Sequence, residues 1–365
     1  MLRKAVCGFV GLLAGCALQR SPEGVGTSLG PEQAQAVIAA ALPGGLADPA
    51  GWTRDIYTGF ATQQLAVTEE SVCAVVAVIE QESNFQVNPV IPGLGTIAWR
   101  QIDGRARQAG LPLAIVHGAL ALRSSDGRTY SQRIDAARTE KDLSDIFEDF
   151  IGEVPLGNRL FADLNPIRTR GPMQVNVAFA RQYVNVRPYP YPLKGSLADA
   201  LFTRRGSLYF GIAHLFAYQP PYHEYLFRFA DFNAGQFASR NAAFQSAIGR
   251  ISGRPLITDG ALLPGDEQHG PGETQLALDA LAPRLDTDAR NIDDALHKGR
   301  SEDLEQTRIY QRVFALAERS AGHPLPRAIV PVIKLQGPKI SRILTTSWYA
   351  HRVQGRFDRC LRRAR

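Results

Sequence analysis

One glutamate is marked by its place on a predicted helix. Residues 68–85, TEESVCAVVAVIEQESNF, show the 3.6-residue apolar period of a helix, and Thr68 is a residue type that caps helix starts. Glu82 follows Ile79 by three residues, so it lies on the apolar stripe near the C-terminal end. Burial and the helix-end dipole both disfavour a carboxylate and predict a raised pKa, which suits a general acid. A buried glutamate paired with an arginine is the structural alternative.

Three short motifs follow one another along the chain. They are Glu82-Ser83-Asn84-Phe85, Gly171-Pro172-Met173-Gln174 and Phe232-Asn233-Ala234-Gly235. In this order they resemble the ESxF, GLMQ and YNAG motifs of lytic transglycosylases in the lysozyme-like superfamily. Pro172 stands in the leucine position of that pattern, and Phe232 in the tyrosine position. Taken singly, the second and third strings are explained by turn and helix-end chemistry alone.

The resemblance implies a role for each motif. Glu82 would be the catalytic acid and base, and Ser83 would support the substrate or hold the glutamate. Met173 and Gln174 would line the cleft near the scissile bond. Asn233, beside Phe232, would hold its loop or the N-acetyl group of a sugar.

The resemblance also implies a reaction that needs one glutamate and no cofactor. Such enzymes cleave the β-1,4 bond between N-acetylmuramic acid and N-acetylglucosamine in peptidoglycan and leave a 1,6-anhydro product. A hydrolytic muramidase with two carboxylates needs a second acid about 5–9.5 Å from the first. Asp163 and Asp231 remain open as that second acid. Neither stands out as an obvious partner of Glu82, and this favours a lytic transglycosylase, which is a glycan lyase, over a muramidase.

Two departures from the family pattern support a second hypothesis. Phe232 lacks the hydroxyl that the usual tyrosine can offer to the acid, although another tyrosine such as Tyr183 could replace it. Gly171 lies 89 residues after Glu82, which implies an insertion with helices of its own at about residues 93–168. The alternative is therefore a non-catalytic peptidoglycan-binding or scaffold lipoprotein that retains the fold.

Further aromatic and histidine residues give weaker signals. Tyr183, Tyr189 and Tyr191 either stack on sugar rings or pack a proline-rich loop, and both interpretations stay open. The histidines at positions 214, 223 and 351 have no metal-ligand spacing, so we expect no metal. The net charge of +6 favours an anionic partner without identifying one, and nothing in the chain indicates nucleic acid.

The N-terminus predicts export and lipidation. Arg3 and Lys4 precede an apolar stretch that is too short to span a membrane. It ends in Leu13-Ala14-Gly15-Cys16, which resembles a bacterial lipobox with Cys16 as the lipidated residue. We therefore expect a signal peptide at 1–15 and a tether at 16–30. Ala17 after the cysteine favours an outer-membrane lipoprotein that faces the periplasm of a Gram-negative bacterium.

Two cysteines remain in the expected mature chain. An oxidising periplasm permits a disulfide between Cys73 and Cys360, but Cys73 also lies on an apolar stripe and could be a buried free thiol. The sequence leaves both possibilities open. The expected partners are peptidoglycan and a membrane, through the lipid anchor; no protein partner is indicated.

Helical periodicity dominates the rest of the chain. We predict a mostly α fold, with a lysozyme-like domain at 31–250 and a C-terminal helical extension at 251–365. Residues 86–103 and 251–272 are rich in Gly and Pro and are predicted to be irregular. The predicted helices are 31–42, 53–66, 68–83, 139–151, 196–218, 222–232, 236–251, 273–281, 301–320 and 340–353.

Overall fold

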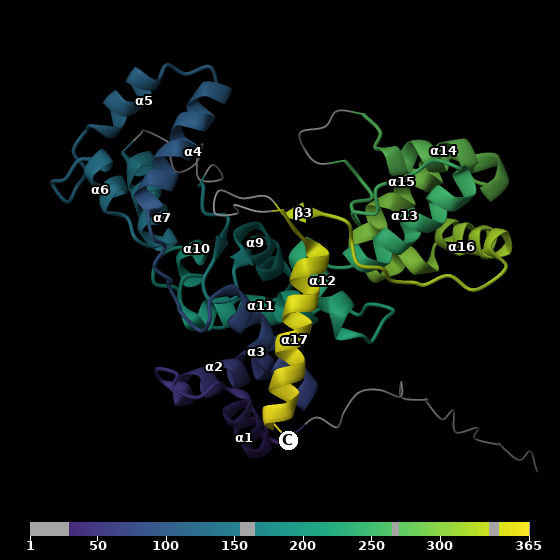
Figure 1. The fold of residues 1–365 in the computed structure, drawn as a ribbon, viewed down its shortest axis with the longest axis horizontal. Coiled ribbons are helices and arrows are strands. Elements are labelled where there is room, and N and C mark those ends of the chain that lie inside the picture. Colours follow the sequence, from purple (N-terminus) through teal and green to yellow (C-terminus); the bar gives the residue numbers. More distant parts are fainter. Residues whose placement is uncertain (1–28, 154–164, 265–269, 336–342, 365) are drawn as a thin grey trace, which may run out of the picture.

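The computed structural model describes residues 29–153, 165–264, 270–335 and 343–364 (Figure 1). The expected signal peptide, the lipidated Cys16 and the candidate acid Asp163 lie outside the described residues. Within them the chain is mostly helical, which confirms the predicted fold class. Two short strand pairs are the sheets of this part of the chain. None of its helices combines the length and apolarity needed to cross a membrane.

A central group of helices forms the first hydrophobic core. Its middle is α3 (Glu69–Glu82), in which every residue from Ser71 to Ile79 is buried. A helix that is apolar on all sides belongs inside a protein, so the single stripe read from the sequence was only part of its buried surface. The surrounding helices are α1 (Pro31–Ala41), α2 (Pro49–Thr62), α11 (Arg204–Phe216), α12 (Tyr225–Ala234) and α17 (Thr346–Ala364).

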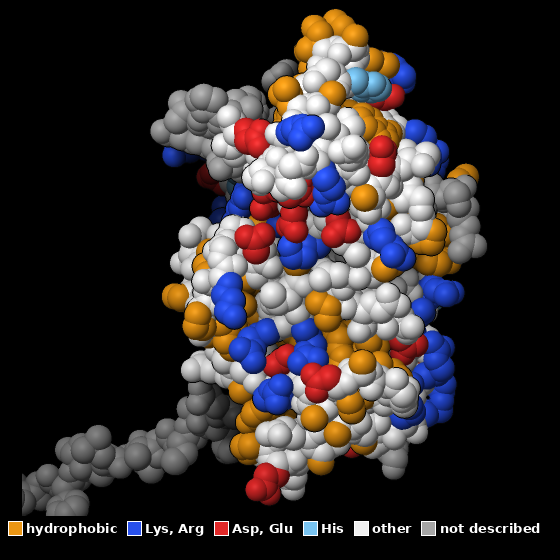
Figure 2. Space-filling view, turned by 90° about the vertical axis from the view of Figure 1, so that its left-hand side faces the viewer, with side chains coloured by type: hydrophobic (Ala, Val, Ile, Leu, Met, Phe, Trp, Pro, Cys, Tyr) orange, Lys and Arg blue, Asp and Glu red, His pale blue; other side chains and the backbone are white. Residues whose placement is uncertain are grey.

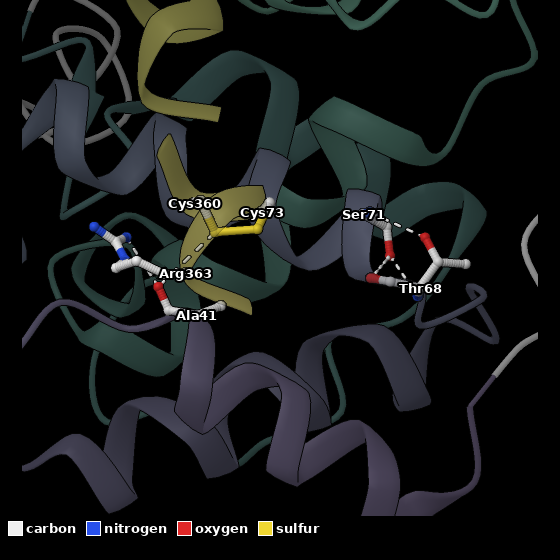
Figure 3. Close-up of a disulfide and its surroundings, with 6 residues drawn as sticks. All are labelled: Ala41, Thr68, Ser71, Cys73, Cys360 and Arg363. Carbon is white, nitrogen blue, oxygen red and sulfur yellow. Dashed lines mark hydrogen bonds between the residues drawn. A yellow bond between two sulfur atoms is a disulfide. The ribbon is translucent and has the colours of Figure 1, made fainter. Parts of the chain in front are cut away.

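The start of α3 is fixed by a capping box. Thr68 Oγ1 accepts a hydrogen bond from the Ser71 amide, and Ser71 Oγ accepts one from the Thr68 amide (Figure 3). The two side chains satisfy backbone donors that a helix start leaves without partners. The predicted cap at Thr68 is therefore confirmed, and α3 begins and ends within a residue of its predicted bounds.

The last helix, α17, lies antiparallel to α3. Cys73 of α3 and Cys360 of α17 form a disulfide with a Cα–Cα distance of 5.4 Å (Figure 3). This pairing is one of the two possibilities that the sequence left open. Beside it, the Arg363 guanidinium donates to the Ala41 carbonyl, which joins α17 to the end of α1. Packing against α3 and α12 makes α17 part of the first core.

The insertion is a separate small group of helices at the upper left of Figure 1. It consists of α4 (Leu94–Gln108), α5 (Leu113–Leu120), α6 (Tyr130–Ala136) and α7 (Glu140–Gly152). These helices have their own small hydrophobic core around Tyr130 and Ile134. The prediction of an irregular segment at 86–103 was wrong from residue 94 onward. Gly93 and Gly95 led to it, but Gly93 adopts a left-handed φ just before the helix, and Gly95 allows close contact with the α6 backbone.

A second core lies at the upper right of Figure 1. It is built from α13 (Ala238–Ser252), α14 (Glu273–Leu285), α15 (Ala289–His297) and α16 (Arg308–Ala321), with short 3₁₀ helices at Lys298–Arg300 and Glu302–Gln306. The predicted extension at 251–365 is thus divided, because α14 and α16 pack on α13, and α15 packs on α14 and α16, whereas α17 returns to α3 and α12.

The remaining short elements connect these groups. The predicted helix at 196–218 is interrupted, since α10 (Leu197–Ala200) ends before Thr203 caps α11. The predicted helix at 340–353 begins later and runs to Ala364. Strands β1 (Thr169–Arg170) and β2 (Val175–Asn176) form an antiparallel hairpin before α9 (Val177–Val186), and β3 (Lys334–Leu335) pairs with β4 (Leu344–Thr345).

Candidate functional site

A cavity of about 1480 Å³ lies between the central helices around α3 and the second core that begins with α13. Glu82 reaches it from the C-terminal end of α3, and Gln174 from the loop of the β1–β2 hairpin. Phe232 and Asn233 reach it from the end of α12. Residues from all three sequence motifs, from Glu82 to Gly235, therefore line one cavity. Tyr349 of α17 lines it too.

Tyr349 donates a hydrogen bond to Glu82. Its hydroxyl lies 2.5 Å from Glu82 Oε1, a short distance typical of a hydroxyl donating to a carboxylate. The tyrosine is buried, and burial and then the nearby Glu82 carboxylate hold the pKa of its hydroxyl well above the usual range. The hydroxyl therefore stays protonated and remains a donor at every pH near neutrality.

Tyr183 does not take this role, and the suggestion that it would replace the missing hydroxyl was wrong. It lines the cavity, but its hydroxyl donates to Gln63 Oε1 at 2.9 Å, on α2. Tyr349 escaped the sequence analysis because it lies 267 residues from Glu82. The apolar periodicity that predicts a helix at 340–353 does not say which helix it packs against.

Gln174 is held by the hairpin that carries it. Gln174 itself has a left-handed φ of 49°, and Thr169 Oγ1 donates to Gln174 Oε1 at 2.8 Å. The side-chain Nε2 of Gln174 also donates to Glu140 Oε2 at 3.3 Å, at the start of α7. Gly171 has a φ of 72°, and a Cβ added there would overlap the carbonyl oxygen of Leu201, at the end of α10, and the side chain of Ser207 in α11.

Ser83 and Met173 support the cavity wall from behind. Ser83 is the C-cap of α3, and its hydroxyl donates to the Ile79 carbonyl at 3.1 Å. Met173 is fully buried against Gly211, and its amide donates to Ser207 Oγ at 3.0 Å. The expected place of Met173 on the cleft surface is therefore wrong. The hydrogen bond from Ser83 to Ile79 lies within α3, so the implied support of the substrate or of Glu82 by Ser83 stays a prediction.

Asn233 and Phe232 connect α12 to its neighbours. Asn233 Oδ1 accepts a hydrogen bond from Thr346 Oγ1 at 2.9 Å, so the start of α17 is tied to the cavity wall. The ring of Phe232 meets that of His214 edge-on, at 5.0 Å between centroids. The Phe232 backbone carbonyl accepts a hydrogen bond from His214 Nε2 at 3.1 Å.

His214 contributes a neutral imidazole to the cavity. Burial lowers its pKa to about 4, even though the Phe232 carbonyl acts in the opposite direction. Because Nε2 donates, Nδ1 carries the lone pair, and it has no hydrogen-bond partner among the described residues. The imidazole is therefore uncharged near neutral pH.

The candidate second acid Asp231 does not face the cavity. It is fully buried and accepts hydrogen bonds from the hydroxyls of Tyr218 and Tyr222 and from the Ser239 amide. Burial raises its pKa. Its hydrogen bonds join α12 to α13, which is a structural role.

The cavity wall has charges besides Glu82. Asp259 is the other carboxylate among the described lining residues, and it accepts hydrogen bonds from the Gln245 side chain and the Ala261 amide. Arg300 and Lys334 also line the wall. The far side of the cavity is thus polar and carries more positive than negative charge.

The tyrosines that follow the hairpin lie in two different environments. Tyr189 stacks on Phe210 with centroids 5.3 Å apart, and Arg205 lies over the ring of Tyr191. Neither tyrosine lines the cavity, so both fit the interpretation of a packed loop, whereas Tyr183 does line it. No group of three potential metal-binding side chains occurs in the described part of the chain.

Fold and site together define a mostly helical protein with a tyrosine-held glutamate in a large cavity. The chain belongs to the family described as "Protein of unknown function (DUF1615)", whose profile matches residues 45–363. A relative from Escherichia coli (strain K12), "Uncharacterized protein YaiW", is 45% identical over 351 residues, which cover 96% of this chain and 95% of the relative. No solved structure gives a significant match. The family match includes both Glu82 and Tyr349.

Proposed function

We propose that the protein is a peptidoglycan lytic transglycosylase with a lysozyme-like catalytic domain. The observation that carries the proposal is the glutamate at the end of α3, which receives the Tyr349 hydroxyl inside a cavity that Gln174, Phe232 and Asn233 also line. Three motifs that are distant in sequence meet around the one residue to which the resemblance assigns the chemistry. A cavity of about 1480 Å³ is also large enough for several sugar rings.

In the proposed reaction Glu82 acts twice. It first gives its proton to the glycosidic oxygen, while the N-acetyl oxygen of the N-acetylmuramic acid attacks the anomeric carbon and the bond to the leaving sugar breaks. The Glu82 carboxylate then takes the proton of the C6 hydroxyl, whose oxygen displaces the N-acetyl group and closes the 1,6-anhydro ring. Tyr349 donates to the carboxylate that the first step creates and so stabilises it.

The place of action follows from the N-terminus. We propose that Cys16 is lipidated and that the protein is held in the outer membrane, facing the periplasm, where peptidoglycan is accessible. The disulfide between Cys73 and Cys360 fits an oxidising compartment.

A non-catalytic binding or scaffold lipoprotein is the second candidate, and Phe232 is the observation that favours it. The Tyr349 hydroxyl weakens that argument because it supplies a donor to Glu82 from another helix. A water-using muramidase is the third candidate, with Asp259 as the other carboxylate of the cavity wall.

The deciding experiment is mass spectrometry of the fragments that the protein, without residues 1–16, releases from purified peptidoglycan. We expect 1,6-anhydromuropeptides from the wild type and none from Glu82→Gln. The matched control is Glu80→Gln, because Glu80 lies on the same helix but pairs with Arg356 and Arg359 away from the cavity. Reducing-end products would support the muramidase instead. Co-sedimentation with the polymer without release would support the binding protein.

A further inference from the structure

The insertion contains an apolar groove that the proposed function does not use. It has a volume of about 470 Å³ and lies between α4, α5 and α7. Among the described residues that line it, all are apolar except Gln101 and Arg105, both on α4. A volume of a few hundred Å³ with an apolar wall and few polar groups is typical of sites for small ligands.

Small side chains create the space. Ala98, Ala106 and Ala109 lie along the groove-facing side of α4, and Ala119 faces it from α5. Because these side chains end at Cβ, they leave volume opposite the larger side chains of α7, such as Phe150. The sequence thus keeps a hollow where larger aliphatic residues would have filled the core of the insertion.

The rim of the groove is apolar and open to solvent. Leu111 is 53% exposed and Ile115 is 65% exposed, and both line the groove. Figure 2 shows hydrophobic side chains gathered at the top of this face, over the insertion. Apolar surface that stays exposed beside an apolar hollow indicates a binding site for an apolar group.

The charges indicate the chemistry of the ligand. Arg105 is exposed at the groove and has no ion pair among the described residues, so its guanidinium is available to an anion. Of the other side chains described along the wall, only Gln101 offers a hydrogen-bonding group. A ligand with polar groups along its length would lose their hydrogen bonds on entering, whereas an aliphatic chain would lose none.

We propose that the insertion binds the acyl chain of an anionic amphiphile, with the chain in the groove and the acidic end at Arg105. A free fatty acid and an anionic membrane lipid share this chemistry. The proposal stands independently of the glycan-cleaving activity, because the groove and the cavity at Glu82 share no lining residue.

The first test is fluorescence titration of the full mature chain with cis-parinaric acid, a fluorescent C18 fatty acid, and with its methyl ester. We expect saturable binding, with the ester bound more weakly by up to roughly fivefold, as for an exposed ion pair. The affinity of competing saturated fatty acids should rise roughly fourfold for each added methylene until the groove is full. No saturable binding of either probe would overturn the proposal.

Matched variants locate the binding. Ala119→Leu fills the groove and should abolish binding, whereas Ala114→Leu adds the same atoms to an exposed face of α5 and should not. Arg105→Gln should remove the preference for the acid over the ester, whereas Arg107→Gln on the same helix should keep it. Circular dichroism checks the folding of each variant, and Ala106→Leu serves as a second groove-filling variant. Undiminished binding by a folded groove-filling variant would overturn the proposal.

Sedimentation with vesicles separates the two sources of the acyl chain. Binding to phosphatidylglycerol vesicles, but not to phosphatidylcholine vesicles, that Ala119→Leu abolishes would identify a membrane lipid. Binding of the free acid alone would identify a soluble ligand.

Discussion

At the scale of single residues, the site depends on a donor that comes from the far end of the chain. Glu82 receives the Tyr349 hydroxyl, while Phe232 occupies the position where the resembling family carries a tyrosine. If Glu82 is the acid we propose, Tyr349 of α17 supplies the hydroxyl donor that Phe232 of α12 lacks.

Tyr349→Phe tests the role of this hydroxyl. It removes one hydrogen bond to a carboxylate, worth about 1.5–3 kcal/mol, so the turnover number on peptidoglycan should fall roughly 10- to 100-fold. Adding Phe232→Tyr to that variant should restore part of the lost turnover, because it returns a hydroxyl to the position that the family uses. If Tyr349→Phe turns over at the wild-type rate, the hydroxyl has no part in the reaction. The fold itself is checked by thermal unfolding.

Gly171 offers a second test, of the hairpin below Gln174. Gly171→Ala should lower the free energy of unfolding by about 2–4 kcal/mol, because the residue has a left-handed φ and no room for a Cβ. Gly104→Ala is the control, since Gly104 lies inside α4 with nothing within 4 Å of an added Cβ. It should stabilise the protein by about 0.5–1 kcal/mol. Urea denaturation measures both; equal effects would contradict the argument.

At the scale of elements, α3 and α17 form an antiparallel pair fastened at two points. The Cys73–Cys360 disulfide joins them at one end, and the Glu82–Tyr349 hydrogen bond joins them at the other. Nine residues of α3 separate the two points, or about 14 Å along the helix axis. The disulfide thus fixes the register in which Tyr349 meets the acid.

Replacing both cysteines by serine should therefore affect stability and activity together. The bond closes a loop across 287 positions, and its loss should lower the free energy of unfolding by about 2–5 kcal/mol. Turnover should also fall as α17 loosens. Differential scanning calorimetry and fragment release measure the two effects. Unchanged turnover in a destabilised variant would show that the packing of α17 holds Tyr349 in place without the disulfide.

Prediction from the sequence succeeded where the signal was local. The period of Val72, Val75 and Ile79 with a cap at Thr68 located α3, and it placed Glu82 at the helix end. It failed where tertiary contacts decide. The residues of α17 show a helical pattern, but only packing reveals that α3 and α12 are its partners. Met173 was misplaced because a four-residue motif does not specify which side chain of a turn faces the core.

At the scale of the whole molecule, one buried base gives stability a dependence on pH. The pKa of His214 is lowered to about 4 in the folded protein, from an ordinary value of 6.5. The unfolded chain therefore binds a proton between these values that the folded protein does not. The stabilising contribution is complete above pH 6.5 and is lost as the pH falls toward 4.

His214→Gln should flatten this dependence, because the amide can donate to the Phe232 carbonyl but does not titrate. Between pH 7 and 4 the free energy of unfolding of the wild type should fall by about 3 kcal/mol more than that of the variant. Chemical denaturation at a series of pH values measures the difference. Parallel curves for the two proteins would mean that His214 does not remain neutral.

The return of α17 to α3 has a consequence for how the protein is made. A ribosome makes α3 well before α17, so Glu82 is synthesised more than 260 residues before the tyrosine that donates to it. Neither the disulfide nor the Glu82 contact can form until the final helix, Thr346–Ala364, has emerged. An incomplete or C-terminally clipped chain would carry all three motifs and still lack the finished site. The order of synthesis thus leaves the cavity without Tyr349 until α17 has been made.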